Sequence, residues 1–193
     1  MLQDQTVAIL GTGNIGRALQ GGLRQGDDVP AGRIRVTRRT PSALDALAEQ
    51  FPGIWTGTDN LAAVDGARVV ILAVKPQHIG GLLGEIRGHV APGAVVLSVL
   101  AGITTDAIGE ALGGEIAVVR SMPNTPALVG EGATAIAAGT HATDEHLALA
   151  EAVLLSGGTS KGPGDLNVAV LDEHLEAPGE EEHGVALKPG KPL

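Results

Sequence analysis

The sequence contains no cysteine and very few aromatic residues. Among its 193 residues there is no Cys or Tyr, with one Phe and one Trp. The lack of cysteine excludes a disulfide framework, a thiol nucleophile and a thiolate-bound metal. A core without aromatic residues must be built from Ala, Val, Leu and Ile, and the hydrophobic fraction of 44% is large enough to supply one.

Positive charge and long apolar runs are also scarce. The chain has 13 basic and 22 acidic residues, a formal net charge of −9, which argues against a general nucleic-acid-binding surface. No apolar run reaches the roughly 18 residues of a membrane span. The opening MLQDQTVAIL is too short and too acidic for a signal peptide. We expect a cytoplasmic protein with neither a nucleic-acid nor a membrane partner.

Metal-binding patterns are absent as well. The six histidines are scattered without an i, i+4 pair, and no carboxylate cluster has ligand spacing. We therefore expect no metal site. No Ser-His-acid or nucleophile-elbow pattern occurs either, so hydrolysis by an activated serine is not indicated.

Strand-like and helix-like segments alternate along residues 6–155. Short β-branched apolar runs predict strands at residues 6–10, 33–37, 53–56, 67–74, 94–99, 115–120 and 133–139. Helical periodicity and capping residues predict helices at 14–26, 40–50, 59–67, 77–88, from Thr104 or Thr105 onward, and at 143–155. This alternation predicts a Rossmann-like, doubly wound, mostly parallel α/β sheet.

The chain changes character near Ser156. SGGTSKGPGD has loop composition, and PGEEEHGVALKPGKPL is charged, proline-bearing and without a usable period. We expect two parts: a dinucleotide-binding Rossmann domain at residues 1–155, and a divergent, disordered tail at 156–193.

The segment GTGNIG follows the first predicted strand and opens the first predicted helix. Gly11, Gly13 and Gly16 have the G-x-G-x-x-G spacing of a dinucleotide-binding loop. The first glycine allows a tight turn, the second allows close approach to a pyrophosphate, and the third allows close packing of helix on strand. This context favours dinucleotide binding over a merely structural turn.

The end of the second predicted strand bears on the choice of dinucleotide. An acidic residue there would accept from the ribose 2′-OH of NAD. This sequence has Thr37 instead, followed by Arg38 and Arg39. Hydroxyl and guanidinium groups can bind a 2′-phosphate, which an acid would repel. The pattern favours NADP(H) over NAD(H), with a solvated basic surface patch as the alternative.

Two further motifs follow strands in the same way. AVKP, residues 73–76, ends the long buried strand and so places Lys75 and Pro76 where ligands bind in open parallel sheets. SVLAGI, residues 98–103, supplies small residues that suit a wall beside a flat ring or, equally, tight packing.

The most distinctive segment is RSMPNTPALVGEG, residues 120–132. It follows a predicted strand, and it contains no titratable side chain between Met122 and Gly130. Two prolines restrict the turn, which limits the entropy lost on ordering it. Such a stiff, uncharged turn suits a wall of a binding site better than a source of acid or base.

Together, VAILGTGNIGRAL, AVKP, SVLAGI and RSMPNTPALVGEGATAI resemble the pyrroline-5-carboxylate reductases. The resemblance covers residues 6–155 and implies NAD(P)H-dependent reduction of 1-pyrroline-5-carboxylate to proline. It places Met122, Pro123, Asn124 and Thr125 on the substrate side and leaves the catalytic residues unknown. The cofactor contacts suggested by the resemblance and by the motifs are Leu10, Gly11, Thr12, Gly13, Asn14, Ile15, Gly16, Thr37, Arg38, Arg39, Asn60, Val74, Lys75, Pro76, Ala101 and Gly102.

The C-terminal part departs from that family. Family members continue with a helical domain that forms an intertwined dimer, and its SGSGPAY-like helix start and PGGT-like turn do not occur in this sequence. Truncation, an altered reading frame or a natural short form would each explain the tail. The departure predicts weak or no reductase activity of this chain alone. It also predicts a monomer or weak self-association, with apolar surface exposed on the helix at 143–155.

Two alternatives stay open at this point. Other small NADP-dependent Rossmann reductases, such as the deazaflavin-dependent NADP reductases, share the first 30 residues but do not require the MPNTP turn. A non-catalytic dinucleotide-binding domain would share the fold and lack the chemistry.

Overall fold

The computed structural model describes residues 2–25, 28–123 and 134–156. Its strands are β1 (Val7–Leu10), β2 (Ile34–Thr37), β3 (Trp55–Gly57), β4 (Val69–Leu72), β5 (Val95–Ser98), β6 (Ala117–Pro123) and β7 (Thr134–Ala138). Its α-helices are α1 (Asn14–Gln25), α2 (Ser42–Gln50), α3 (Asn60–Val64), α4 (Ile79–Ile86), α5 (Thr105–Leu112) and α6 (Asp144–Leu154). The 3₁₀ turns are η1 (Ala31–Arg33) and η2 (Pro76–His78). The expected tail at 156–193 lies outside the described residues from 157 onward.

The strands form one sheet in the order β3-β2-β1-β4-β5-β6-β7. The first six strands are parallel, and β7 pairs with β6 in the antiparallel direction. The chain begins in the middle of the sheet, builds one half outward to β3 and then returns to β4 beside β1. This arrangement confirms the predicted doubly wound, mostly parallel sheet.

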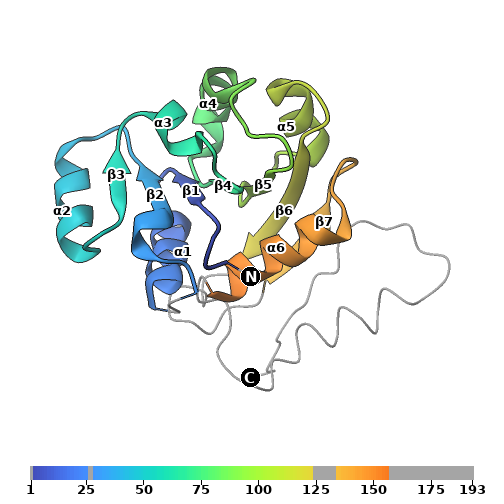
Figure 1. The fold of residues 1–193 in the computed structure, drawn as a ribbon. Coiled ribbons are helices and arrows are strands. Elements are labelled where there is room, and N and C mark those ends of the chain that lie inside the picture. Colours follow the sequence, from blue (N-terminus) through green and yellow to red (C-terminus); the bar gives the residue numbers. More distant parts are fainter. Residues whose placement is uncertain (1, 26–27, 124–133, 157–193) are drawn as a thin grey trace, which may run out of the picture.

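Apolar residues cover both faces of the sheet, as the continuous apolar strands require. Alternate residues of β1 point to opposite faces, so Ile9 packs in the core under α1 and α6, and Leu10 in the core under α3, α4 and α5. Figure 1 shows these two helical layers on opposite sides of the sheet. The four residues of β1 and the four of β4 are all fully buried.

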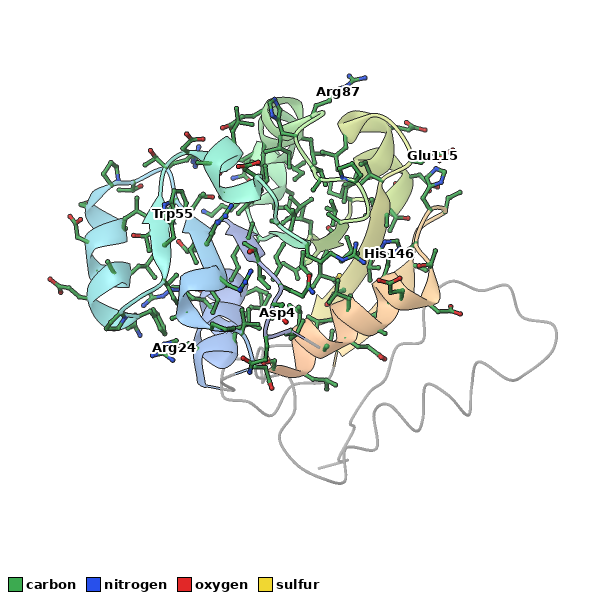
Figure 2. The ribbon with its side chains drawn as sticks, in the orientation of Figure 1. Asp4, Arg24, Trp55, Arg87, Glu115 and His146 are labelled. Carbon is green, nitrogen blue, oxygen red and sulfur yellow. The ribbon has the colours of Figure 1, made fainter. Side chains whose placement is uncertain are left out.

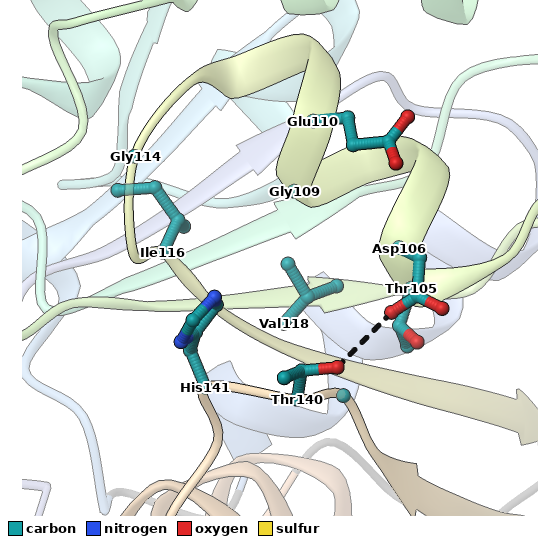
Figure 3. Close-up of a pocket in the computed structure, with 10 residues that line it drawn as sticks. Thr105, Asp106, Gly109, Glu110, Gly114, Ile116, Val118, Thr140 and His141 are labelled. Atoms are coloured by element: carbon teal, nitrogen blue, oxygen red, sulfur yellow. Dashed lines mark hydrogen bonds between the residues drawn. The ribbon is translucent and has the colours of Figure 1, made fainter.

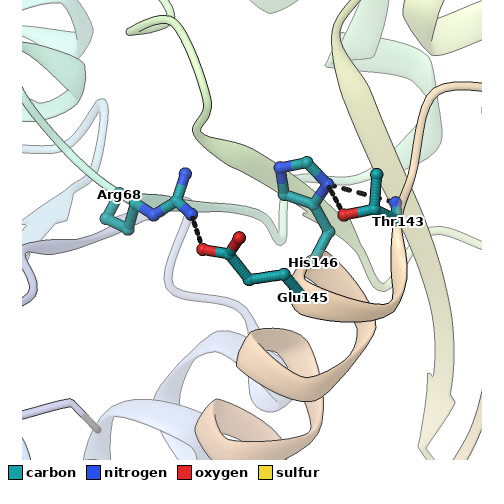
Figure 4. Close-up of polar contacts among 4 residues, drawn as sticks. All are labelled: Arg68, Thr143, Glu145 and His146. Atoms are coloured by element: carbon teal, nitrogen blue, oxygen red, sulfur yellow. Dashed lines mark hydrogen bonds and ion pairs between the residues drawn. The ribbon is translucent and has the colours of Figure 1, made fainter.

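Polar contacts fix the beginning of α6. Nδ1 of His146 accepts a hydrogen bond from the backbone N–H of Thr143 over 3.1 Å, so histidine takes the role that Glu or Gln has in a capping box. Glu145, in the first turn of α6, lies 2.7 Å from the guanidinium of Arg68, just before β4 (Figure 4). The predicted N-cap at Thr143 is therefore confirmed.

The apolar face of α6 is covered. Leu149, Ala150, Val153 and Leu154 are at most 5% exposed because they pack on the sheet. The expectation of exposed apolar surface on this helix was wrong for these four residues. Leu155, just beyond the helix, is 38% exposed.

The helix after β4 is shorter than predicted. The predicted span of 77–88 divides into η2 and α4 because Pro76 begins a 3₁₀ turn before the α-helix. Pro76 stands at the first position of that turn, where its missing N–H costs nothing. Four residues of α4 are buried, and each of them packs on the sheet: Ile79, Leu82, Leu83 and Ile86.

Charged side chains lie on the outside of this sandwich. Arg24, Arg87 and Glu115 point away from the sheet in Figure 2. Trp55, on the edge strand β3, is 37% exposed. Among the described residues, no helix is long and apolar enough to cross a membrane.

Candidate functional site: the carboxyl edge of the sheet

The carboxyl ends of five strands lie in one row with Arg120 of β6. The register pairs Gly57 with Thr37, Thr37 with Leu10, Leu10 with Leu72, Leu72 with Ser98, and Ser98 with Arg120. The loops that carry the predicted cofactor residues therefore leave the sheet at the same edge. The topology reverses at β1, and ligands of open parallel sheets bind at such a point.

Two glycines of the loop after β1 are required by packing within the protein. Gly11 has a φ of 98°, and a Cβ there would lie 2.8 Å from the carbonyl oxygen of Ala73. A Cβ on Gly16 would overlap the carbonyl oxygen of Gly11 and lie 3.2 Å from Cβ of Ala73. The lack of a side chain at both positions therefore lets the start of α1 lie close to Ala73, just after β4, as expected from the sequence.

Gly13 differs from these two glycines. A Cβ there would meet only the carbonyl oxygen of Ala73, at an ordinary distance of 3.8 Å. The protein therefore does not itself require glycine at this position. Gly13 is exposed, and the space above its backbone is open to a ligand.

Thr12 supports the same interpretation. Its side chain is 5% exposed, and Oγ1 has no hydrogen-bond partner in the described part of the chain. A buried hydroxyl without a partner is costly and calls for an explanation. It lies in the loop beside the N-terminus of α1, where backbone N–H groups and the helix dipole favour an anion. A dinucleotide pyrophosphate fits these donors.

Side-chain hydrogen bonds join the end of β2 to the start of α3, and α3 to α4. The hydroxyl of Thr37 donates to Oδ1 of Asn60 over 2.7 Å, and Nδ2 of Asn60 donates to Oε2 of Glu85 over 2.8 Å. Thr37 is only 2% exposed. The sequence had suggested that this hydroxyl contacts the cofactor. In this structure it is buried and donates to Asn60 instead.

The two arginines after Thr37 lie closer to solvent. Arg38 is half-buried, and its backbone N–H donates to the carbonyl of Gly57 over 3.1 Å. Arg39 is exposed, with Nη2 3.0 Å from Nε2 of His78 in η2. Both residues directly follow β2, where the sequence predicted a 2′-phosphate, and the guanidinium of Arg39 lies against η2.

The loops after β4 and β5 complete the row of candidate residues. Lys75 and Pro76 are exposed, and Val74 is half-buried with its Cγ1 near the position of a Gly11 Cβ. Ala101 and Gly102 are exposed too, with Gly102 at a φ of 75°. They lie beyond Ser98, whose hydroxyl accepts from the N–H of Leu100 over 3.3 Å.

The predicted substrate-side residues begin at the end of β6. This strand runs three residues past Arg120, which stands level with the ends of its neighbours. Met122 is 42% exposed at this projecting end. Pro123 is the last residue of the strand, whereas Asn124 and Thr125 lie outside the described residues.

A separate pocket lies away from this edge. Its volume is about 420 Å³, and it opens between α5 and the turn after β7 (Figure 3). The hydroxyl of Thr140 donates to Asp106 on its rim over 3.3 Å. None of the predicted cofactor residues lines it. Within residues 2–25, 28–123 and 134–156, no cluster of His, Asp and Glu could hold a metal ion.

Sequence reasoning missed two residues that contact the candidate site, His78 and Glu85. Their partners are 39 and 25 positions away in the chain. Neither residue belongs to a recognised motif, so the available signal was only the position of His78, two residues after the VKP segment.

A parallel sheet with a glycine loop at its switch point defines a Rossmann-type nucleotide-binding domain. A family model described as NADP oxidoreductase coenzyme F420-dependent matches residues 6–102. The chain belongs to this family, whose members use pyridine nucleotides. The matched range ends before the MPNTP turn, so the match to this family does not depend on the distinctive segment at residues 120–132.

The curated relatives are pyrroline-5-carboxylate reductases, which confirms the resemblance seen in the sequence. The enzyme of Corynebacterium melassecola is 41% identical over 145 residues, which are 74% of this chain and 53% of the relative. Pyrroline-5-carboxylate reductase 1 of Bacillus subtilis is 34% identical over 154 residues, 80% of this chain and 52% of the relative. An alignment covering 80% of the chain necessarily includes residues 120–132. The chain spans about half the length of these relatives.

Solved structures agree on the fold. A pyrroline-5-carboxylate reductase from Coxiella burnetii superposes with a TM-score of 0.75 at 31% identity, covering 86% of this chain and 62% of that one. The Plasmodium falciparum pyrroline carboxylate reductase with NADP bound has a TM-score of 0.71 at 17% identity, covering 91% of this chain and 66% of that one. At that lower identity the likeness concerns the fold.

Proposed function

We propose that this chain binds NADP(H) along the carboxyl edge of its sheet. The observation that carries the proposal is the row of strand ends, which gathers the glycine loop, the two arginines and the VKP segment at one switch point. The pyrophosphate would bind at residues 10–16, and the 2′-phosphate at Arg38 and Arg39. Asn60 would contact the adenosine side.

The nicotinamide would lie farther along the row, toward β5 and β6. Val74, Lys75 and Pro76 would line one side of it, and Ala101 and Gly102 another. The small side chains and the open backbone at Gly102 suit a flat ring. Met122 to Thr125 would then stand on the substrate side, because β6 projects past its neighbours.

We infer that the reaction served by this domain is the reduction of 1-pyrroline-5-carboxylate to L-proline. When bound, the reduced nicotinamide would supply a hydride to the imine carbon, with a proton added to the imine nitrogen. The protein contributes orientation and exclusion of water rather than covalent catalysis. The 34–41% identity to reductases of this name supports the substrate assignment.

We further propose that the chain alone has weak or no reductase activity. The residues of the carboxyl edge build the cofactor side, and the segment from Met122 onward supplies one wall for the substrate. The curated relatives extend over about twice the aligned length, and we infer that their remaining part supplies the other walls. A misplacement of about 1 Å can already cost on the order of 100-fold in rate.

Two measurements test these proposals. Calorimetric titration of the full chain with NADPH and NADH is expected to show binding of both, with NADPH tighter. Binding of neither would exclude the proposed cofactor site. Oxidation of NADPH in the presence of pyrroline-5-carboxylate is expected to be far slower than with a full-length relative, and turnover at the relative's rate would refute the need for further walls.

A dinucleotide-binding domain without catalysis is the second candidate. The part of the relatives beyond the aligned half favours it, if that part is needed to hold the substrate. Supplying the helical part of a relative as a second chain distinguishes the two candidates. Restored turnover would support a reductase, whereas nucleotide binding without turnover would support a binding domain.

A further inference from the structure

Arg39 and His78 form a side-chain contact across the carboxyl edge. Nη2 of Arg39 lies 3.0 Å from Nε2 of His78. A guanidinium can only donate hydrogen bonds, so Nε2 must accept and the imidazole proton must be on Nδ1. The contact joins the loop after β2 to η2, which follows β4. Because β1 lies between β2 and β4 in the sheet, the contact connects elements on either side of β1.

The contact leaves most of the guanidinium available. An arginine has five N–H donors, and the contact with His78 uses one of them. Within the described residues, the ion pair between Arg68 and Glu145 does not involve Arg39 or Arg38. Arg39 is also exposed, so a phosphate can reach its remaining donors without disturbing the core.

We propose that His78 is a positioning residue that holds Arg39 ready for the 2′-phosphate of NADP(H). This inference rests on the NADP(H) preference proposed above and adds the residue that sets its strength. A free arginine on the surface samples many rotamers, and binding must then order it at an entropic cost. Fixing one end of the guanidinium beforehand removes part of that cost and aims the planar group at the phosphate.

Adenosine 2′,5′-bisphosphate and 5′-AMP isolate this effect, because they differ only in the 2′-phosphate. The full chain and its variants are titrated with each nucleotide by calorimetry, and the ratio of the two dissociation constants is the readout. Arg39→Ala is expected to lower the preference for the bisphosphate about tenfold, since charge-assisted hydrogen bonds are lost. His78→Ala is expected to lower it about threefold, since Arg39 must then be ordered on binding.

His78→Gln is the matched rescue variant. Its amide oxygen can accept from Arg39, so it is expected to restore most of the preference. Affinity for 5′-AMP is measured in all three variants as the reference for the ratio, and a loss confined to the bisphosphate assigns the effect to the 2′-phosphate. Thermal unfolding of each variant checks that the fold is retained.

The possible failures are distinct. Wild-type protein that binds neither nucleotide overturns the cofactor site and this inference with it. Wild-type protein that binds both equally overturns the NADP(H) preference and the role of Arg39 together. A preference that survives in Arg39→Ala assigns the phosphate to other residues. A preference lost in Arg39→Ala but intact in His78→Ala overturns the positioning role of His78 alone.

Discussion

Thr37 and Asn60 are joined by a hydrogen bond of 2.7 Å between Oγ1 and Oδ1. Because the hydroxyl must donate to this amide oxygen, Nδ2 of Asn60 is directed to Glu85. The side chain that the resemblance places at the nucleotide is thus oriented by a buried residue on one side and an exposed carboxylate on the other.

Thr37→Val is expected to lower the free energy of unfolding by about 1 kcal/mol, because a half-buried amide oxygen loses its donor. Urea denaturation measures this change. Thr37→Ser, which keeps the hydroxyl, is expected to lose less. A valine variant as stable as the wild type would show that the bond contributes nothing to the fold.

The two glycines Gly13 and Gly16 are expected to respond differently to alanine. Gly16→Ala places a methyl group against the carbonyl of Gly11 and should cost about 1–3 kcal/mol of stability. Gly13→Ala meets no close protein atom and should leave stability within about 0.5 kcal/mol while weakening NADPH binding. Denaturation and titration of both variants separate the packing role from the ligand role. Equal stability losses would contradict this division.

Arg38→Asp is expected to weaken NADPH binding more than NADH binding. The new carboxylate would repel the 2′-phosphate, whereas it could accept from the 2′-OH of NADH. We expect the preference to change by at least about tenfold, or about 1.4 kcal/mol. Titration with each cofactor gives the ratio, with Arg33→Asp as a control on the opposite end of β2. Parallel losses for the two cofactors would remove Arg38 from the phosphate site.

Gly139→Ala is expected to destabilise the fold through the turn after β7. A Cβ there would lie 2.8 Å from both the carbonyl oxygen of Val118 and Cβ of Thr105. Overpacking of this kind costs about 1–3 kcal/mol. Gly84→Ala in α4 is the control, since its Cβ would meet nothing within 4 Å and alanine favours a helix. Chemical denaturation should show a lower free energy of unfolding for Gly139→Ala than for the wild type, and a higher one for Gly84→Ala.

The ion pair between Arg68 and Glu145 is expected to contribute little. The side chain of Glu145 is 78% exposed, and that of Arg68 is 27% exposed. Exposed pairs contribute about 0.2–1 kcal/mol, and salt screens them. Glu145→Gln should therefore lower stability by less than about 1 kcal/mol, with the difference shrinking in high salt. A larger loss that salt does not reduce would indicate a packing role for this side chain.

The sequence predicted the strands and most helices because their signals are local. Apolar β-branched runs gave β1 and β4, and the caps Asp59 and Thr104 accept hydrogen bonds from the N–H groups of Ala62 and Ala107, as expected of N-caps. The direction of β7 was not predicted, because the apolar pattern of a strand is the same whichever way it runs. The division of the span 77–88 depended on Pro76, whose local effect the helical periodicity did not include.

Within the candidate site, the sequence predicted the loops but not how their side chains pair. The motif suggested Thr37 as a phosphate ligand, because the sequence alone does not show that this side chain is buried. Its bond to Asn60 and the contact of Arg39 with His78 depend on the lateral spacing of strands, which only the folded sheet sets. The roles of Asn124 and Thr125, outside the described residues, stay predictions.

The place of β1 in the sheet sets an order in which this domain can assemble during synthesis. Val7 pairs with Ile34 on one side and with Val69 on the other, so the second partner is translated long after the first. Until then β1 has an unpaired apolar edge, the kind of edge that makes folding intermediates prone to aggregation. Gly11 and Gly16 pack against Ala73, so the nucleotide loop takes its final form only once that residue has left the ribosome.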